Sequence, residues 1–213
     1  MPIVCWTAIL CALLLSCLLS FAWAMKHFFT QPTGTSLGMS LIKFSGAAFG
    51  LTHLSALALL GAAGAERAAL AALAYAASLA LFWWTLSTHQ HTPISAVFSR
   101  DLPHRVVQDG PYRFVRHPFY ASYLLMWLAA PIGAGQWWLA TAALIMGGVY
   151  YSAAKSEEKK FAESAVANHY ARYRAATGLF LPNPLKMLQR FTAPRTQTRT
   201  PSRTQSRTLG LEE

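Results

Sequence analysis

Charged residues are scarce in this chain of 213 residues. Lys, Arg, Asp and Glu make up 12% of the sequence, against about a quarter in an ordinary soluble domain. Residues 3–24 and 44–65 contain none of the four. A soluble core does not need uncharged runs of that length, whereas about 20 apolar residues span a bilayer as a helix. The sequence therefore excludes an ordinary soluble domain and predicts an integral membrane protein.

Cysteine is also rare. Cys5, Cys11 and Cys17 all lie in the first apolar run. Because a spacing of six places successive cysteines on different faces of a helix, a metal or redox pair is excluded, and we expect small apolar residues. The run also lacks the basic segment that begins a secretory signal peptide, which favours an uncleaved span.

Acidic residues are few, with 8 Asp and Glu against 18 Lys and Arg, for a formal charge of +10. Much of the excess lies in the last third of the chain. Residues 191–213 are predicted to be a disordered basic tail, which either solubilises the chain or contacts anionic lipid. A nucleic-acid partner would require a basic fold with interleaved aromatic residues, which the sequence lacks, so none is expected.

The apolar segments predict an all-α membrane protein with about five transmembrane helices. A short turn at residues 64–67 predicts that the second and third spans are antiparallel neighbours, and Pro and Gly at 131–135 predict a helical hairpin. Residues 1–87 would form three N-terminal spans. Residues 88–190 would form a second region with a long polar loop, the hairpin and a C-terminal helix, which either begins at Ser156 or extends the last span. The five predicted spans are residues 3–24, 44–63, 68–87, 119–130 and 136–154.

Basic residues in the connections predict the orientation of the chain. With five spans, the linker at 26–43, the connector at 88–118 and the C-terminal region share one side of the membrane, and they hold nearly all the Lys and Arg. Basic connecting segments favour the cytoplasmic side. We therefore expect the N-terminus outside and the C-terminus in the cytoplasm.

The connector at 88–118 is the most informative polar segment. Loops of this length are usually functional or disordered, and the prolines and aromatic residues here favour a rigid functional loop at the membrane surface. His89 and His91 are two residues apart and could bind a metal on a strand. No third ligand is apparent, so we interpret them as interfacial polar residues and expect no metal.

A composite pattern begins in this connector. It reads Gly110-x-Tyr112-x-x-x-Arg116-His117-Pro118-x-Tyr120, followed by the hairpin, then Glu157-Glu158 and Tyr170-x-x-Tyr173. In this order, over about residues 104–182, the pattern resembles the membrane-integral S-adenosylmethionine methyltransferases. These include the isoprenylcysteine carboxyl methyltransferases and the phospholipid N-methyltransferases.

The resemblance implies that residues 88–190 are the catalytic region, with a loop that binds S-adenosylmethionine. His117 and Glu157 would be catalytic. Arg116 would either contact the acceptor or anchor a lipid phosphate at the interface, and Lys155 could meet the acceptor as a point charge. Tyr170 and Tyr173 would close the pocket by packing. The implied contacts to S-adenosylmethionine are His104, Arg105, Val106, Val107, Tyr112, His117, Pro118, Phe119, Tyr120 and Glu157.

The chemistry of these residues agrees with such a cofactor. Aromatic rings can stack on its purine or line its sulfonium cation. A histidine can bond its carboxylate or amine, and a glutamate suits its ammonium group. A solvated acidic pair beside Lys159 and Lys160 is the structural alternative for Glu157 and Glu158.

Departures from the family pattern bear on the acceptor. The carboxyl methyltransferases have an arginine near the acidic pair, where this chain has Ala153, Ala154 and Lys155; a lysine supplies a point charge and no bidentate fork. The leading hypothesis is methyl transfer to the carboxylate of a lipid-like or prenylated acceptor. The alternatives are methylation of a phospholipid amine or a small amine or thiol, and a non-catalytic scaffold or transporter subunit. Transporters usually show internal repeats or polar residues within spans, and neither is found here.

Overall fold

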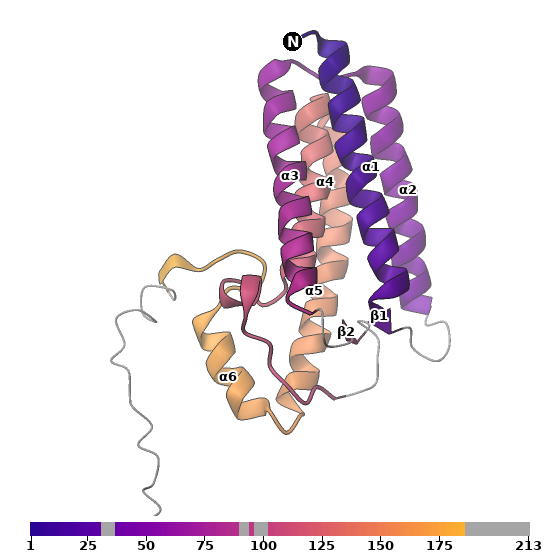
Figure 1. The fold of residues 1–213 in the computed structure, drawn as a ribbon. Coiled ribbons are helices and arrows are strands. Elements are labelled where there is room, and N and C mark those ends of the chain that lie inside the picture. Colours follow the sequence, from indigo (N-terminus) through magenta and orange to yellow (C-terminus); the bar gives the residue numbers. More distant parts are fainter. Residues whose placement is uncertain (31–36, 90–93, 96–101, 186–213) are drawn as a thin grey trace, which may run out of the picture.

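The computed structural model describes residues 1–30, 37–89, 94–95 and 102–185, and its longest helices stand side by side as an upright bundle (Figure 1). These helices are α1 (Ile3–His27), α2 (Leu37–Leu60), α3 (Ala65–Ser87), α4 (Pro118–Ala134) and α5 (Ala140–Ala162). α5 continues below the others and leads into α6 (Ala167–Ala176), which lies beneath the bundle. The 3-10 turns η1 (Gly110–Arg113) and η2 (Trp137–Leu139) precede α4 and α5, and β1 (Phe29–Thr30) pairs in parallel with β2 (Ile94–Ser95).

The structure confirms the predicted all-α membrane class. Three helical segments are long and apolar enough to cross a bilayer, namely Ile3–His27, Ile42–Leu60 and Ala65–Ser87. α4 has only 17 residues, and α5 carries a charged second half. The number of five spans therefore stays a prediction. The predicted tail at 191–213 and His91 lie outside the described residues, as do parts of the linker and the connector.

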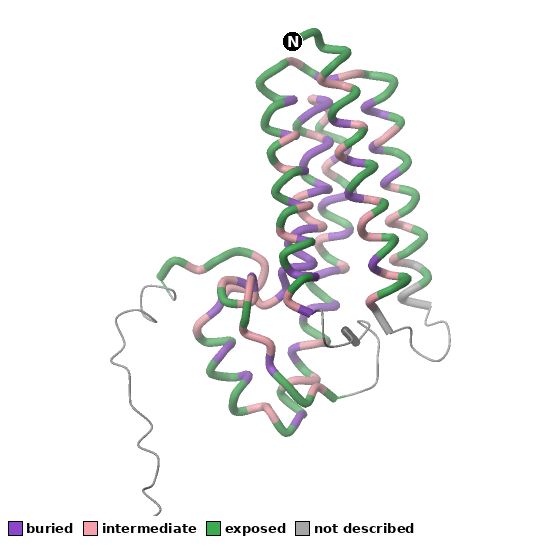
Figure 2. The backbone as a smooth tube through the Cα atoms, viewed as in Figure 1, coloured by how far each residue is buried: buried purple, intermediate pink, exposed green. Residues whose placement is uncertain are grey.

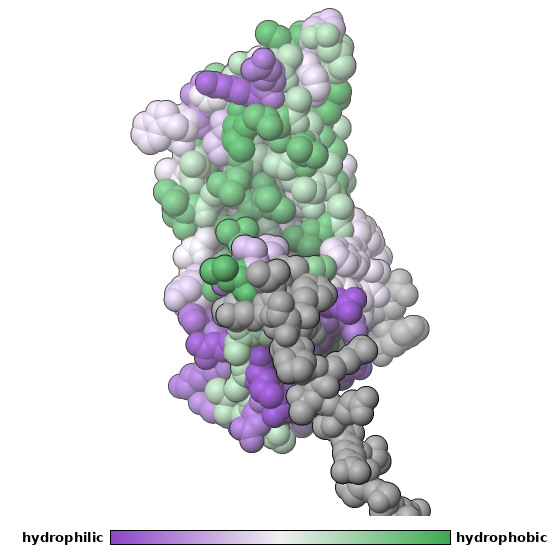
Figure 3. All heavy atoms as spheres, turned by 90° about the vertical axis from the view of Figure 1, so that its left-hand side faces the viewer, coloured by the Kyte–Doolittle hydropathy of each residue, from purple (hydrophilic) through white to green (hydrophobic). Residues whose placement is uncertain are grey.

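Exposed apolar side chains cover the upper bundle. Leu59, Leu70 and Phe44 are among the large apolar residues with most of their surface accessible. The exposed outer faces of the helices are visible in Figure 2, and Figure 3 shows a hydrophobic middle region between a small hydrophilic patch near the top and a hydrophilic lower end. Such a surface matches a bilayer around the bundle and water around its polar end.

Two predictions about the spans were wrong in part. α2 and α3 run antiparallel, but α1 lies between them (Figure 1), and α3 packs chiefly on α4. α4 also does not stop at residue 130: it passes through Pro131 and ends at Gly135, whose φ is 65°. A proline removes one helical hydrogen bond without breaking the chain of the others, whereas a left-handed glycine ends a helix.

Small residues allow the close approach of α1, α3 and α4. A Cβ on Gly133 would lie 2.7 Å from a methyl carbon of Leu10 and 2.9 Å from the Cβ of Ala71. The Ser78 hydroxyl of α3 donates to the carbonyl of Ser122 in α4 at 2.7 Å. This tight interface fixes the start of α4, and therefore the residues just before it, relative to the bundle.

Candidate active site

The segment before α4 is held by the chain that follows α6. The amide of Arg116 donates to the carbonyl of Gly178 at 2.9 Å, and the amide of His117 donates to that of Leu179 at 3.1 Å. A Cβ on Gly178 would collide with the carbonyl oxygen of Leu181, so only glycine fits where the chain at 178 passes Leu181. The Tyr173 hydroxyl adds a bond to the carbonyl of Tyr112 at 2.8 Å. Residues 112–117 are thereby fixed from below by the C-terminal region.

A proline and a glycine fix the backbone around the site residues. Pro118 is the first residue of α4, where its missing amide leaves no helical hydrogen bond unmade, so His117 directly precedes the helix and Tyr120 lies within its first turn. Gly110 has φ 55° and lies against the Thr88 hydroxyl, where a side chain would collide. The Tyr112 hydroxyl is 2.9 Å from Nε2 of His89 at the end of α3.

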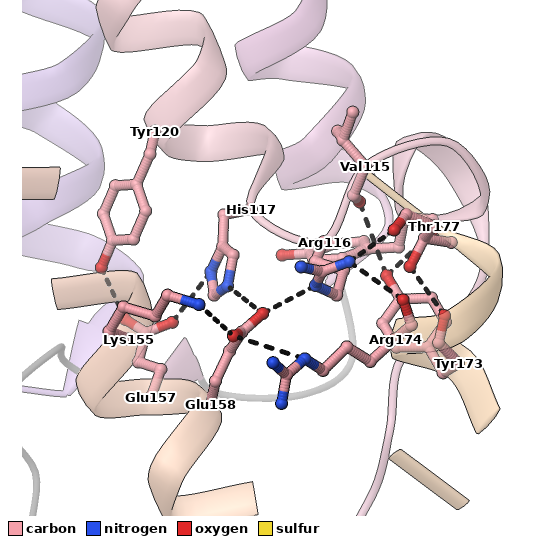
Figure 4. A network of polar contacts seen from close by, with 11 residues as sticks. Val115, Arg116, His117, Tyr120, Lys155, Glu157, Glu158, Tyr173, Arg174 and Thr177 are labelled. Carbon is pink, nitrogen blue, oxygen red and sulfur yellow. Dashed lines mark hydrogen bonds and ion pairs between the residues drawn. The ribbon is translucent and has the colours of Figure 1, made fainter. Parts of the chain in front are cut away.

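Glu157 is held at both carboxylate oxygens (Figure 4). The Tyr120 hydroxyl donates to Oε1 at 2.5 Å, and Nδ1 of His117 is 3.3 Å from Oε2. Its side chain keeps 29% of its surface accessible. A carboxylate oriented by two neighbours and still reachable is suited to meet a cationic group of a ligand.

Glu158 has different surroundings. It is buried, and its Oε1 accepts from Nε of Arg116 at 2.7 Å, while Lys155 and Arg174 approach Oε2 at 3.4 and 3.8 Å. Burial acts to raise the pKa of Glu158, but the Arg116 hydrogen bond and the three nearby cations outweigh it and hold the pKa below its ordinary value. Arg116 also donates to the carbonyls of Arg174 and Thr177. Glu158 therefore joins α5, the loop and α6, as Figure 4 shows.

His117 lies between the two glutamates. Its ring is 7% accessible, and its Nε2 is 4.0 Å from Glu158 and makes no hydrogen bond with any described residue. The ring stacks on Tyr120 with centroids 5.6 Å apart. The His117 ring therefore lies in the cavity wall between two carboxylates, with Nε2 on the side of Glu158 and Nδ1 on the side of Glu157.

Tyrosine rings form the next layer. Tyr120 stacks on Tyr150 of α5 at 5.4 Å with an interplanar angle of 6°. Burial and the nearby Glu157 carboxylate hold the pKa of Tyr112 well above its ordinary value. At neutral pH its hydroxyl is therefore protonated and offers a hydrogen.

One cavity of about 1380 Å³ collects these groups. All ten cofactor contacts expected from the sequence line it, from His104 to Glu157, and so does Arg116. Lys155 does not line it; 43% of its side-chain surface is accessible, and its ammonium turns toward Glu158. Since Arg116 is also engaged by Glu158, neither of the two expected acceptor contacts is directed at the cavity centre. Tyr170 and Tyr173 line the cavity while packing against Val106, as the packing interpretation requires.

The cavity includes residues that sequence reasoning passed over. α1 and α2 supply much of its wall, although the first spans show only apolar sequence. Lys26 and Lys43 lie on this wall, as do Tyr123 and Tyr150 of the hairpin. A lysine at the end of one apolar run and another near the start of the next were available signals for a shared polar boundary.

The residues present fit S-adenosylmethionine. The oriented Glu157 carboxylate suits an ammonium group, and the His117 ring lines the same cavity. Tyr112, Phe119 and Tyr120 give aromatic faces for a purine or a sulfonium. Within the residues that the structure describes, no cluster of three or more His, Cys, Asp or Glu could hold a metal ion.

A family model matches part of the chain. Residues 66–169 match the family model described as phospholipid methyltransferase. The matched region contains α3, the loop, α4 and α5, and ends inside α6. No curated protein matches the chain.

Proposed function

Because residues 66–169 belong to the phospholipid methyltransferase family, we propose that this protein transfers a methyl group from S-adenosylmethionine to a lipid-like acceptor. The observation that supports this most is the convergence of Tyr120, His117 and Glu157 on one cavity beside the apolar bundle. The family match also favours an enzyme over a scaffold or a transporter subunit.

Glu157 would bind the ammonium end of the cofactor, with Tyr120 and His117 keeping both carboxylate oxygens in place. S-adenosylmethionine supplies a methyl carbon whose bond to sulfur breaks as the bond to the acceptor forms, with the electron pair staying on sulfur. Such a displacement depends on alignment, and the rigid loop and stacked tyrosines would provide it.

The first acceptor candidate is a carboxylate, as in isoprenylcysteine carboxyl methylation. A carboxylate oxygen is already nucleophilic, so the reaction releases no proton and needs no base. The cationic lining supports this candidate: Lys26, Lys43, Arg105 and Lys160 all border the cavity. A prenylated or other lipid chain would fit its apolar walls.

The second candidate is the amine of a phospholipid. An ammonium must lose a proton before it attacks, and Glu157 with His117 at 3.3 Å would supply an acceptor for that proton. The same basic lining would then face the lipid phosphate. Product chemistry separates the two candidates, because a methyl ester is released by base and an N-methyl group is not.

We further propose that the polar end faces the cytoplasm, with the N-terminus outside. The hydrophilic lower end in Figure 3 carries the loop, α6 and most of the described basic residues. Loop basicity favours the cytoplasmic side. The water-soluble cofactor would then reach the cavity from the cytoplasm and the lipid-like acceptor from the bilayer.

Isothermal titration of purified protein in nanodiscs with S-adenosylmethionine tests the proposal. We expect saturable binding by the wild type and loss of binding in the Glu157→Ala, His117→Ala double variant. Glu163→Ala is the matched control, because Glu163 is exposed at the end of α5 and pairs with Lys159. Absence of saturable binding by the wild type would refute the enzyme assignment.

A further inference from the structure

The cavity has an apolar end that the proposed cofactor site does not use. It extends from the tyrosines into the space bordered by α1, α2, α4 and α5. The side of α2 that lines the cavity has small residues, which leave space beside the helix: Gly46, Ala47 and Gly50. The larger apolar side chains around it are Leu15, Leu18, Ile42, Leu54, Trp127 and Met146.

Two of the four helices around this apolar end lie outside the family match. The match begins at residue 66, whereas α1 and α2 occupy Ile3–His27 and Leu37–Leu60. The ten expected cofactor contacts therefore all lie within the matched residues, whereas much of the wall of the apolar end is built by unmatched ones. The family match therefore includes the residues expected to carry the reaction and does not include α1 and α2, which line the apolar end.

The size of the cavity exceeds the need of one small ligand. Its volume is about 1380 Å³, whereas sites for single drug-sized ligands occupy about 300–1,000 Å³. Leu15, Leu19 and Leu51 border the cavity and are also 45%, 61% and 65% accessible. The apolar end therefore opens sideways through the bundle surface that matches the bilayer.

Charge selects an amphiphile as the occupant of this space. Lys26 lies in the last turn of α1 and Lys43 in the first half of α2, so both border the cavity near the ends of these helices. The cofactor already carries a net positive charge, so these lysines do not complement it. An anionic group at the polar end, joined to a hydrocarbon chain at the apolar end, would satisfy both regions.

We propose that α1 and α2 form the binding chamber for the hydrocarbon chain of the acceptor, with Lys26 and Lys43 facing its anionic group. This inference rests on the proposed function, because it assigns the occupant as the methyl acceptor. The chain enters from the bilayer between α1 and α2 and brings its head toward Glu157. The acceptor is then a lipid-like anion whose tail is selected by helices outside the family match.

A large side chain in place of Gly46 is a selective way to fill the chamber. A Cβ at Gly46 meets nothing within 4 Å, so a side chain there projects into open space without displacing the backbone. Gly50 is less suitable, because its Cβ would lie 3.0 Å from Leu18. Gly148 of α5 also has nothing within 4 Å, but it does not border the cavity, and it gives a matched control.

The test uses hexadecanoic acid carrying a photoreactive diazirine in mid-chain, with the full-length protein in phosphatidylcholine nanodiscs. In the wild type we expect cross-links in peptides of α1, α2 and α4 that contain Leu18, Ile42 or Trp127. Gly46→Phe should lose these cross-links, and Gly148→Phe should keep them. Both variants should bind S-adenosylmethionine like the wild type, because the polar end is unchanged.

A second comparison tests the two lysines. The Lys26→Gln, Lys43→Gln variant should lose the preference for the fatty acid over the diazirine-bearing alcohol of the same length, whereas Lys159→Gln should retain it. Lys159 is exposed and outside the cavity. An unchanged preference in the double variant would overturn the anionic assignment.

The outcomes separate the chamber from the proposed function. Equal labelling of Gly46→Phe and Gly148→Phe, with cofactor binding intact, would overturn the chamber alone. Labels confined to the outer faces of the bundle would do the same. Failure of the wild type to bind S-adenosylmethionine would overturn the proposed function and the assignment of the chain to an acceptor.

Discussion

Glu157 and Glu158 are adjacent in sequence and have opposite surroundings. Glu157 faces the cavity and is oriented by Tyr120 and His117, whereas Glu158 is buried among Arg116, Lys155 and Arg174. Because they are consecutive residues of a helix, the two side chains leave α5 in different directions, which accounts for this difference. Of these two neighbours, Glu157 lines the cavity, whereas Glu158 connects α5 to the loop and α6.

Glu157→Gln tests the ligand-facing role. The amide keeps the size of the side chain and its contact with Tyr120 but removes the negative charge. We expect S-adenosylmethionine affinity to fall about tenfold or more, since each factor of ten is about 1.4 kcal/mol and charged hydrogen bonds contribute that much. Titration calorimetry measures it. Equal affinity in Glu157→Gln and wild type would contradict the assignment.

Tyr120→Phe separates orientation from stacking. Phenylalanine retains the ring that stacks on Tyr150 but loses the hydroxyl that donates to Glu157 at 2.5 Å. We expect methyl transfer to fall about tenfold while the thermal midpoint stays near that of the wild type. A large loss of thermal stability would indicate instead that the hydroxyl supports the fold.

Most of the polar site could be read from the sequence. The composite pattern from His104 to Glu157 names residues that the structure gathers at one cavity. The engagement of Arg116 and Lys155 with Glu158 could not be read, because it depends on which face of α5 meets the loop. Their roles as acceptor contacts stay predictions, and the geometry favours a structural role for both.

At the scale of elements, α6 and the chain after it hold the loop before α4. Glu158, Arg116 and the backbone bonds at Gly178 and Leu179 connect them. This connection brings residues more than forty positions apart to one place. It explains why the pattern needs both the loop and the later acidic pair.

Glu158→Gln should loosen this connection. Removing one partner of a buried ion pair leaves the other charge uncompensated, at a cost of about 3 kcal/mol. A lower midpoint of thermal unfolding in detergent measures the effect. Glu163→Gln should leave the midpoint unchanged, because Glu163 is exposed. A Glu158→Gln variant as stable as wild type would show that the pair does not hold α6.

The same residue predicts an acid dependence. The folded-state pKa of Glu158 lies below its ordinary value of 4.5. Its contribution to stability is therefore present above that value and is lost as the pH falls through the folded pKa. The difference in thermal midpoint between wild type and Glu158→Gln should shrink as the pH drops below about 4.5. A constant difference down to the folded pKa would contradict this sign.

Two glycines should respond oppositely to alanine. Gly133→Ala introduces a Cβ against Leu10 and Ala71 at 2.7 and 2.9 Å, which should destabilise the α1, α3 and α4 contact by about 1–3 kcal/mol. Gly148→Ala meets nothing within 4 Å and should stabilise α5 by about 0.5–1 kcal/mol. Thermal midpoints in detergent compare them. Equal shifts in the same direction would refute the packing.

The boundaries of the elements were less predictable than their existence. Pro131 indicated a break, but the helix continues to Gly135 because α4 is supported on both sides by α1 and α3. The short turn after α2 fixed the antiparallel direction of α3 and left open which helix packs between them. Apolar sequence alone does not specify that order, since every face is compatible with lipid.

For the whole molecule, the bundle and its polar end are arranged as the proposed reaction between a water-soluble donor and a membrane-bound acceptor requires. The middle of the bundle is hydrophobic and the lower end is hydrophilic (Figure 3), with the cavity extending from polar to apolar residues. Composition predicted the membrane class, and the motif predicted the polar end. The contribution of α1 and α2 required the fold, because nothing in their sequences resembles a site.

Methyl transfer itself tests the central claim most directly. Purified protein in nanodiscs is incubated with S-adenosylmethionine labelled in its methyl group and with extracted membrane lipids, and the organic-soluble label is counted. We predict label in a lipid-like product with wild type and with Glu163→Gln, and a loss of that label with Glu157→Gln. Wild-type protein that binds S-adenosylmethionine but transfers label to no organic-soluble product would contradict the claim.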